Sequence, residues 1–225
     1  MKMINKPLFC VVAALLAVGV VPAQAAIRIT EVAPWASGNA PYSTDWFELT
    51  NTGASAVSIA GWKMDDSSNG TAKVTLTGIT SIGSGESVIF LESASGNASF
   101  LSTWFGGAAP VGLQIGNYTG AGVGLSTSGD AVNIYNNTNG LEANVTFSAS
   151  DSVSPYQTFD NAAGLNGTAI SLFSVAGING AFVAANDLSE IGSPGSIAAV
   201  PEPETYALLL AGLGLIGLVA RKRQH

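Results

Sequence analysis

Hydrophobic positions follow two different patterns along this 225-residue chain. Between residues 26 and 196 apolar side chains mostly alternate with polar ones, a period of two that predicts β-strands with one buried face. Near each end the pattern changes to a continuous uncharged run, Leu8–Val21 and Tyr206–Ala220. The sequence therefore predicts a β-domain flanked by two segments of a different kind.

The alternating segments are separated by clusters of Gly, Asn, Ser and Thr, which favour turns. The Asn139-Gly140 pair predicts a hairpin. The apolar phase switches between Ile59 and Trp62, and Gly61 at the switch indicates a β-bulge. Seven or eight strands are expected, which predicts an all-β sandwich. The expected strands lie around Ile27–Thr30, Trp46–Thr50, Val57–Ile59, Trp62–Met64, Val74–Leu76, Val88–Leu91, Val132–Ile134 and Leu141–Phe147.

Two stretches, 94–121 and 148–195, interrupt the alternation. No window outside the two end runs has a helical period, so both stretches are expected to be irregular. The first contains Phe100 and Trp104 among glycines and is too apolar for a solvated loop. The second ends in Ser193-Pro194-Gly195, which predicts the closing turn of the domain.

The N-terminal segment has the three parts of a cleaved secretion signal. Lys2 and Lys6 precede the apolar run, and small residues follow at Ala23 and Ala25. Fourteen helical residues span about 21 Å, which is short of the ~30 Å hydrocarbon core of a membrane. We therefore expect residues 1–25 to be removed by signal peptidase after Ala25, once the secretion machinery has engaged them.

The C-terminal segment, residues 197–225, combines two prolines, an apolar run and a basic end. Pro201 and Pro203 exclude helix, so the first part is expected to be extended. An apolar helix over 205–220 and a basic tail over 221–223 are expected to follow. Arg221, Lys222 and Arg223 are basic, as is the start of the N-terminal signal. The positive-inside rule therefore predicts that both ends of the chain stay cytoplasmic and that the region between them lies on the far side of the inner membrane.

These parts, in this order, resemble the PEP-CTERM sorting signal of Gram-negative bacteria. The resemblance implies recognition by exosortase, a membrane cysteine protease, with cleavage near Pro201, Glu202 and Pro203. It also implies a genome that makes exopolysaccharide, and a destination at the cell surface or in an extracellular matrix.

The central strands carry a second resemblance, to bacterial lamin-tail domains. It rests on ITEV at 29–32, DWFELTNTG at 45–53, VSIAGWKMDD at 57–66, SIGSGESVIFLES at 81–93 and LSTSGDAVNIYNNTNG at 125–140. The resemblance implies an immunoglobulin-like β-sandwich over residues 26–196, with 94–121 as an insertion. It also implies a binding or structural module.

Composition then excludes several kinds of chemistry. Three cations and thirteen acidic residues lie between 26 and 199, a net charge of −10, and that field repels nucleic acids. The only cysteine is Cys10 and the only histidine is His225. The exported region therefore has no disulfide, no thiol nucleophile and no histidine base.

Two weak candidate sites remain in the domain. Trp35, Tyr42 and Trp104 are either core residues or a platform on which sugar rings stack. Asp65, Asp66 and Asn69 begin like a calcium loop, but Leu76 stands where the bidentate glutamate is needed, so a polar turn competes with a metal site. The remaining acidic residues, including Glu31, Asp45, Glu48, Glu86 and Glu142, are expected to face solvent.

We therefore expect an exported, surface-sorted, non-enzymatic binding or structural protein without a resident cofactor, associated with an exopolysaccharide or biofilm matrix. One alternative is a secreted hydrolase that cleaves matrix polysaccharide with paired carboxylates. The other is a calcium-dependent adhesin, in which calcium bridges the acidic surface to an anionic polysaccharide.

Overall fold

The structure is a computed structural model of the 225-residue chain. It describes residues 27–67, 73–150, 153–161 and 168–196, together with 212, 213 and 216. In chain order its elements are β1 (Ile27–Ala33), α2 (Ala36–Asn39), β2 (Trp46–Asn51), β3 (Val57–Ser58), β4 (Lys63–Asp65), β5 (Val74–Thr75), β6 (Ser81–Ile82), β7 (Ser87–Leu91), η1 (Ala94–Gly96), α3 (Asn97–Phe105), β8 (Gln114–Asn117), β9 (Asp130–Tyr135), β10 (Leu141–Phe147), β11 (Tyr156–Gln157), β12 (Phe159–Asp160), β13 (Ala169–Ile170), β14 (Phe182–Val183) and β15 (Glu190–Gly192).

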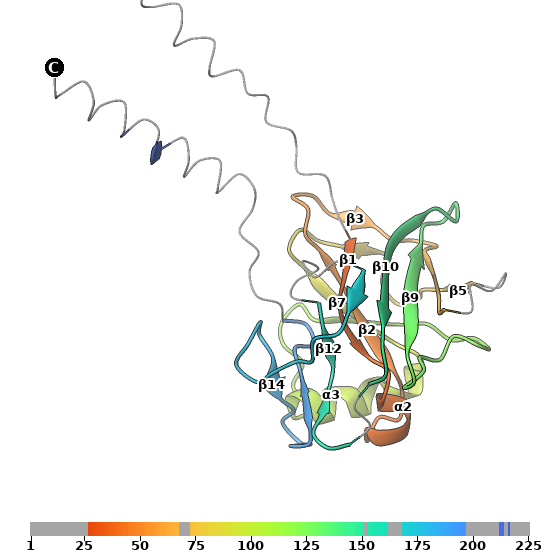
Figure 1. Cartoon of the computed structure of the whole chain (residues 1–225). Coiled ribbons are helices and arrows are strands. Elements are labelled where there is room, and N and C mark those ends of the chain that lie inside the picture. The colour runs from red at the N-terminus through yellow and green to blue at the C-terminus, as the bar shows by residue number, and fades with distance from the viewer. Residues whose placement is uncertain are drawn as a thin grey trace, which may run out of the picture.

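Two five-stranded sheets form the body of the domain (Figure 1). The first sheet has the strand order β12-β1-β2-β7-β8, and the second has the order β13-β10-β9-β4-β5. Within them neighbouring strands are antiparallel except for the pairs β7–β8 and β10–β13. Strands β11, β15 and β14 form a small third sheet, and β3 pairs with β6.

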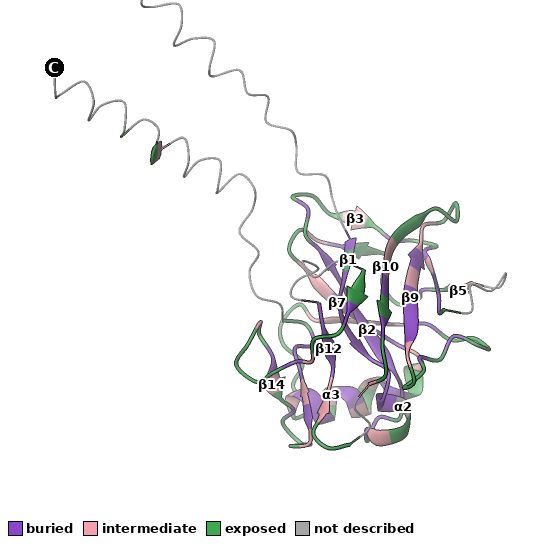
Figure 2. Cartoon of the chain, viewed as in Figure 1, coloured by how far each residue is buried: buried purple, intermediate pink, exposed green. Residues whose placement is uncertain are grey.

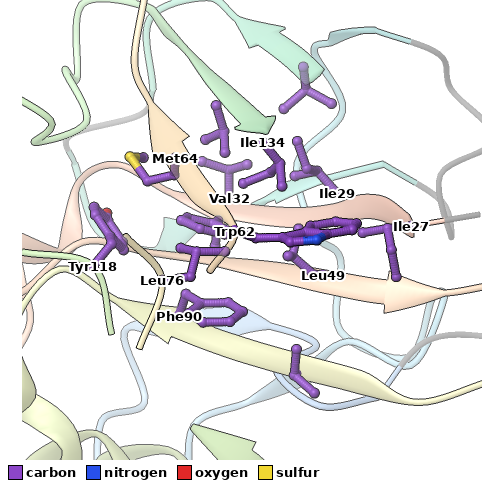
Figure 3. Close-up of a cluster of buried hydrophobic side chains, with 14 of the residues drawn as sticks. Ile27, Ile29, Val32, Leu49, Trp62, Met64, Leu76, Phe90, Tyr118 and Ile134 are labelled. Atoms are coloured by element: carbon purple, nitrogen blue, oxygen red, sulfur yellow. The ribbon is translucent and has the colours of Figure 1, made fainter. Parts of the chain in front are cut away.

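The main core lies between the first and second sheets. Alternate positions of β1, β2 and β7 point into it, as the period of two requires. Its members include Ile29, Phe47, Leu49 and Phe90 from the first sheet, and Met64, Val132, Ile134 and Val145 from the second. Trp62 lies among Ile27, Ile29 and Leu49 in Figure 3 and is 7% exposed. The prediction of a β-sandwich is confirmed.

The first sheet is covered on its other face as well. Helix α3 and the third sheet pack there around Trp46, Phe100 and Trp104, so every residue of β2 is buried (Figure 2). We call α3, β11, β14, β15 and the turn 193–196 the covering layer. The domain therefore has three layers, and the first sheet lies in the middle.

Helix α3 corrects the expectation that residues 94–121 are irregular. Phe100 and Trp104 are four positions apart, so they lie on one helical face, and both are buried against the first sheet. The helix ends at Gly106, whose φ of 66° suits a residue without a side chain. Helix α3 then connects β7 to β8, and a parallel pair needs such a crossover.

The bulge predicted at Gly61 is also wrong. Gly61 has φ 74°, and the backbone N–H of Trp62 donates to the carbonyl of Ile59 (3.0 Å), which defines a tight turn. Strand β3 before the turn pairs with β6, whereas β4 after it pairs with β5 and β9. The switch in apolar phase thus marks the passage of the chain from one sheet to another.

The hairpin predicted at Asn139-Gly140 is confirmed. Strands β9 and β10 are antiparallel neighbours, with Tyr135 opposite Leu141. The N–H of Asn136 donates to the carbonyl of Gly140 (2.8 Å), and Asn139 adopts φ 66°. Asparagine is one of the few residues that occupy this left-handed region readily.

Candidate functional site

Three buried glutamates lie between the first sheet and the covering layer. Glu31 on β1 and Glu48 on β2 are direct cross-strand partners, and Glu190 begins β15. All three are 0% exposed. We call them the buried carboxyl cluster. Because isolated charges are rarely buried, each carboxyl group must find partners inside the protein.

A β-bulge in β1 brings the first two glutamates together. The pairing of β1 with β2 shifts between Ile29, opposite Leu49, and Glu31, opposite Glu48. Without this shift Glu31 would share the face of Ile29 and point into the main core. The extra residue, Thr30, turns Glu31 to the outer face beside Glu48.

The closing turn binds both carboxyl groups through its backbone. Oε1 of Glu31 accepts hydrogen bonds from Ser193 N–H (2.6 Å) and Thr158 Oγ1 (2.5 Å). Oε2 of Glu48 accepts one from Gly195 N–H (2.7 Å), and its Oε1 accepts one from Thr30 Oγ1 (2.5 Å). The turn itself closes with Ser196 N–H donating to the carbonyl of Ser193 (2.8 Å). A turn at the predicted position, Ser193-Pro194-Gly195, is confirmed, and it is fixed to the first sheet.

The third glutamate belongs to an aromatic network. The hydroxyl of Tyr42 donates to Oε2 of Glu190 (2.9 Å). It also accepts hydrogen bonds from the indole N–H groups of Trp46 and Trp104, both at 3.2 Å. One hydroxyl thus joins β2, α3 and β15, and rings of Phe100 and Trp104 pack edge-on against Trp46.

Burial dominates the acid–base properties of this cluster, because removal from water disfavours a charged carboxylate. It raises the pKa of Glu48 to about 7 and the pKa of Glu190 to about 8. Burial, followed by repulsion from Glu48, raises the pKa of Glu31 well above its usual range. Within the described residues Glu31 Oε2 and Glu190 Oε1 accept no hydrogen bond, which adds to the cost of ionisation.

The carboxyl groups of this cluster join two layers of the fold and are not accessible to a substrate. Carboxylates that hydrolyse a glycoside flank the bond they cleave, which requires an open cleft. Here the oxygens are covered by the closing turn and by Trp104, whose ring would lie 2.9 Å from a Cβ placed on Gly192. What the three carboxyl groups do in this structure is attach the covering layer to the first sheet.

A shallow hollow of about 120 Å³ lies elsewhere, between β1 and β10. Polar side chains on its wall include Arg28, Glu142, Asn144 and Asn161. Pockets for small molecules usually have volumes of ~300–1,000 Å³. This hollow is therefore too small to enclose a sugar chain, although its charged wall is open to water.

The sugar-stacking platform predicted at Trp35, Tyr42 and Trp104 is wrong. Their exposed fractions are 0%, 4% and 1%, and all three belong to the cluster beneath the covering layer. Trp35 stacks on Tyr156 and donates its indole N–H to the carbonyl of Gln157 (2.9 Å). A platform needs a free ring face, and the alternative of core packing holds for each of them.

Of the weak calcium candidates, Asp65 ends β4 and Asp66 follows it, and both are buried, whereas Asn69 lies outside the described residues. Oδ1 of Asp65 accepts the Asp66 N–H (3.0 Å), and Asp130 accepts the Ser67 N–H (2.9 Å). The described part of the chain contains no group of three or more acidic, histidine or cysteine side chains arranged for a metal. Calcium binding at this loop stays a prediction.

The residues of the two sorting signals also lie outside the described part of the chain. They are Ala23, Ala25, Pro201, Glu202, Pro203, Arg221, Lys222 and Arg223. The roles predicted for these residues therefore rest on the sequence pattern alone.

The buried carboxyl cluster was not predicted from the sequence. Glu31, Asp45 and Glu48 were expected to face solvent, and the structure buries all three, whereas Glu142 is exposed as expected. The available signal was Trp46, which shares a strand face with Glu48. A tryptophan on the outer face of a strand indicates that this face is covered.

Two packed sheets with this strand order define an all-β, immunoglobulin-like β-sandwich. Comparison with protein families gives a match to the Lamin Tail Domain over residues 21–149. Since this is more than half of the 225 residues, the chain belongs to the Lamin Tail Domain family. The matched region ends before β11, so the third sheet and the closing turn lie beyond it.

A second match covers residues 199–224 and is the PEP-CTERM protein-sorting motif. The motif implies export, membrane-anchored sorting and processing by an exosortase-type system. Among the described residues no helix is long and apolar enough to cross a membrane, and most of 206–220 lies outside them. A comparison with curated proteins gives no match.

Replacing Tyr42 by Phe should destabilise the domain. The change leaves Glu190 Oε2 and two indole N–H groups without this partner, and we expect the free energy of unfolding to fall by about 2–4 kcal/mol. Tyr118→Phe is the matched control, because the Tyr118 hydroxyl is buried without a partner in the described structure. Urea unfolding should show little change or a gain for Tyr118→Phe. Equal losses in the two variants would contradict the proposed network.

Stability should decrease as pH rises from about 4.5 to 8. Glu48 and Glu190 keep their protons in the folded chain up to a pKa of about 7 and about 8, whereas in the unfolded chain they ionise near their ordinary pKa, so the unfolded state binds fewer protons. Glu190→Gln removes one such group and should reduce the slope by up to about 1.4 kcal/mol per pH unit. Near pH 4 the two proteins should have similar dependence on pH, because the glutamate is then uncharged. Parallel unfolding profiles across the whole range would rule out the effect.

Proposed function

We propose that this chain is a non-enzymatic binding or structural protein of an exopolysaccharide or biofilm matrix, delivered to the cell surface by its C-terminal signal. The observation that carries the proposal is the order of the two matches, a lamin-tail domain followed by a sorting motif. The motif begins three residues after Ser196, where the described fold ends. The domain is thus the part that the signal delivers.

The chemistry of the domain supports a role without catalysis. The carboxyl groups that lie closest in register, Glu31 and Glu48, are enclosed by the closing turn. The exported sequence also contains no histidine and no cysteine, as the positions of His225 and Cys10 require. What remains exposed is a polar β-surface suited to non-covalent contact with a matrix.

Maturation in this proposal proceeds in two steps. Signal peptidase removes residues 1–25 after Ala25. The exosortase-type protease then acts near Pro201–Pro203, while the apolar run and Arg221–Arg223 keep the C-terminal end at the inner membrane. Proline at two of three positions supports a segment without helix, which a protease can bind in extended form.

Retention on matrix polysaccharide tests the function directly. The purified domain, residues 26–199, is incubated with polysaccharide from the producing cells, and both binding and chain length are measured. We expect retention with the polysaccharide unchanged in length. Cleavage would favour the alternative of a hydrolase, and retention lost on chelation would favour a calcium-dependent adhesin.

Replacing Pro201 and Pro203 together by Ala tests the role of the C-terminal sorting signal. The double variant should accumulate in the inner membrane without processing, as seen by fractionation and blotting. Pro110→Ala, in a surface turn of the domain, should mature normally. Unchanged processing and release of the double variant would refute the proposed role of these prolines in sorting.

A further inference from the structure

Exposed apolar side chains gather on two turns of the covering side. Val111 is 106% exposed, and Val175 and Ile178 are 53% and 55% exposed. Isolated exposed apolar residues are common in soluble proteins, but a group of them marks a contact surface. The position of this group in the fold indicates what it contacts.

Both turns lie beside the point where the chain leaves the domain. A Cβ placed on Gly180 would lie 2.8 Å from the carbonyl oxygen of Ser196, so the turn of Ile178 touches the last described residue of the domain. A Cβ placed on Gly195 would lie 2.5 Å from Cδ1 of Leu113, which places the turn of Val111 against the same exit. Figure 1 shows the turn before β14 at this side of the molecule.

The turns present these side chains on defined backbone. Leu113 N–H donates to the carbonyl of Pro110 (3.1 Å), and Ile178 N–H donates to the carbonyl of Val175 (2.9 Å). Gly112 and Gly177, both at φ 87°, occupy the left-handed position that such turns need. Val111, Val175 and Ile178 are therefore held outward and do not fold back onto the domain.

The segments that form this surface carry no charged side chain of their own. Residues 93–129 and 161–186, which contain both turns, include no Asp, Glu, Lys, Arg or His. The neighbouring Asp160 is 7% exposed and accepts a hydrogen bond from Asn179 (2.8 Å). Contact with an apolar or anionic layer thus meets little repulsion from the turns themselves.

The length of chain after Ser196 limits where this surface lies. The apolar run of the sorting motif begins at Tyr206, and ten residues span at most about 35 Å when fully extended. While the motif is anchored, the exit side of the domain is therefore kept close to the bilayer. The opposite end, with the β9–β10 hairpin, is the end that projects away.

We propose that Val111, Val175 and Ile178 insert into the headgroup region of the membrane that holds the sorting motif, and so dock the domain on the bilayer before cleavage. This inference rests on the membrane-anchored sorting implied by the motif. Small apolar groups on two turns suit shallow insertion, in which the side chains enter the interface and the backbone remains in water.

Single-site labelling of the full chain tests this docking. In a Cys10→Ser background, Val111→Cys and Ile178→Cys are each labelled with an environment-sensitive fluorophore. Leu141→Cys is the matched control, because Leu141 is also 55% exposed but begins β10 at the far hairpin (Figure 1). The proteins are incorporated into phosphatidylethanolamine–phosphatidylglycerol vesicles, with or without nitroxide-bearing lipid, and flotation is measured in parallel.

The expected result is emission at shorter wavelength, and quenching by nitroxide lipid, for labels at 111 and 178 and not at 141. Floating protein with all three labels in water would overturn the docking while leaving the anchor intact. Labels that are shielded but not quenched would also overturn it, because a second copy or another protein would then cover the surface. Failure to float would remove the anchoring on which the inference depends.

Discussion

The N–H groups of Ser193 and Gly195 donate to the carboxyl groups of Glu31 and Glu48, and the three-layer arrangement depends on these bonds. They attach the end of the domain to the middle of its first sheet. Removal of one partner of a buried hydrogen bond costs more than the bond itself contributes, because the other group is then left buried without a partner. The closing turn therefore acts as a specific latch, since an apolar contact would not fix its position along β1 and β2.

This arrangement depends in turn on one irregular residue pairing. Side chains of a strand alternate strictly, so a shift of one residue exchanges the two faces. The bulge at Thr30 makes this exchange within β1: Ile29 before it points into the main core, and Glu31 after it points outward. The Thr30 hydroxyl then donates to Glu48. The residue that creates the shift thus also partners one of the carboxyl groups that the shift brings together.

Local sequence patterns were sufficient for the sandwich but not for its covering layer. Short apolar segments predicted β2, β7, β9 and β10, because each of these strands has a face on the continuous apolar core between the two sheets. Helix α3 was missed because only two of its residues, Phe100 and Trp104, mark the buried face across nine positions. The bulge was expected at Gly61 and occurs at Thr30, because no glycine is needed where the extra residue keeps an allowed conformation.

The burial of the glutamates was unpredictable for a different reason. Three of the partners of Glu31 and Glu48 are residues 158, 193 and 195, which lie more than a hundred positions away along the chain. In the sequence, a glutamate on the outer face of a strand has the same pattern whether that face is exposed to solvent or covered. Only the position of the covering layer in the fold distinguishes the two cases. The aromatic residues showed the same limit, since Trp35 and Tyr42 find Tyr156 and Glu190 only in the folded domain.

The latch also dictates the order of events during biogenesis. The hydrogen bonds of the closing turn join residues that are 162 and 147 positions apart, so they form only after Ser193 and Gly195 have emerged. In a polypeptide that crosses a membrane from its N-terminus, the covering layer is therefore completed at the end of the passage. Completion of the fold then coincides with the arrival of the sorting motif, only a few residues behind.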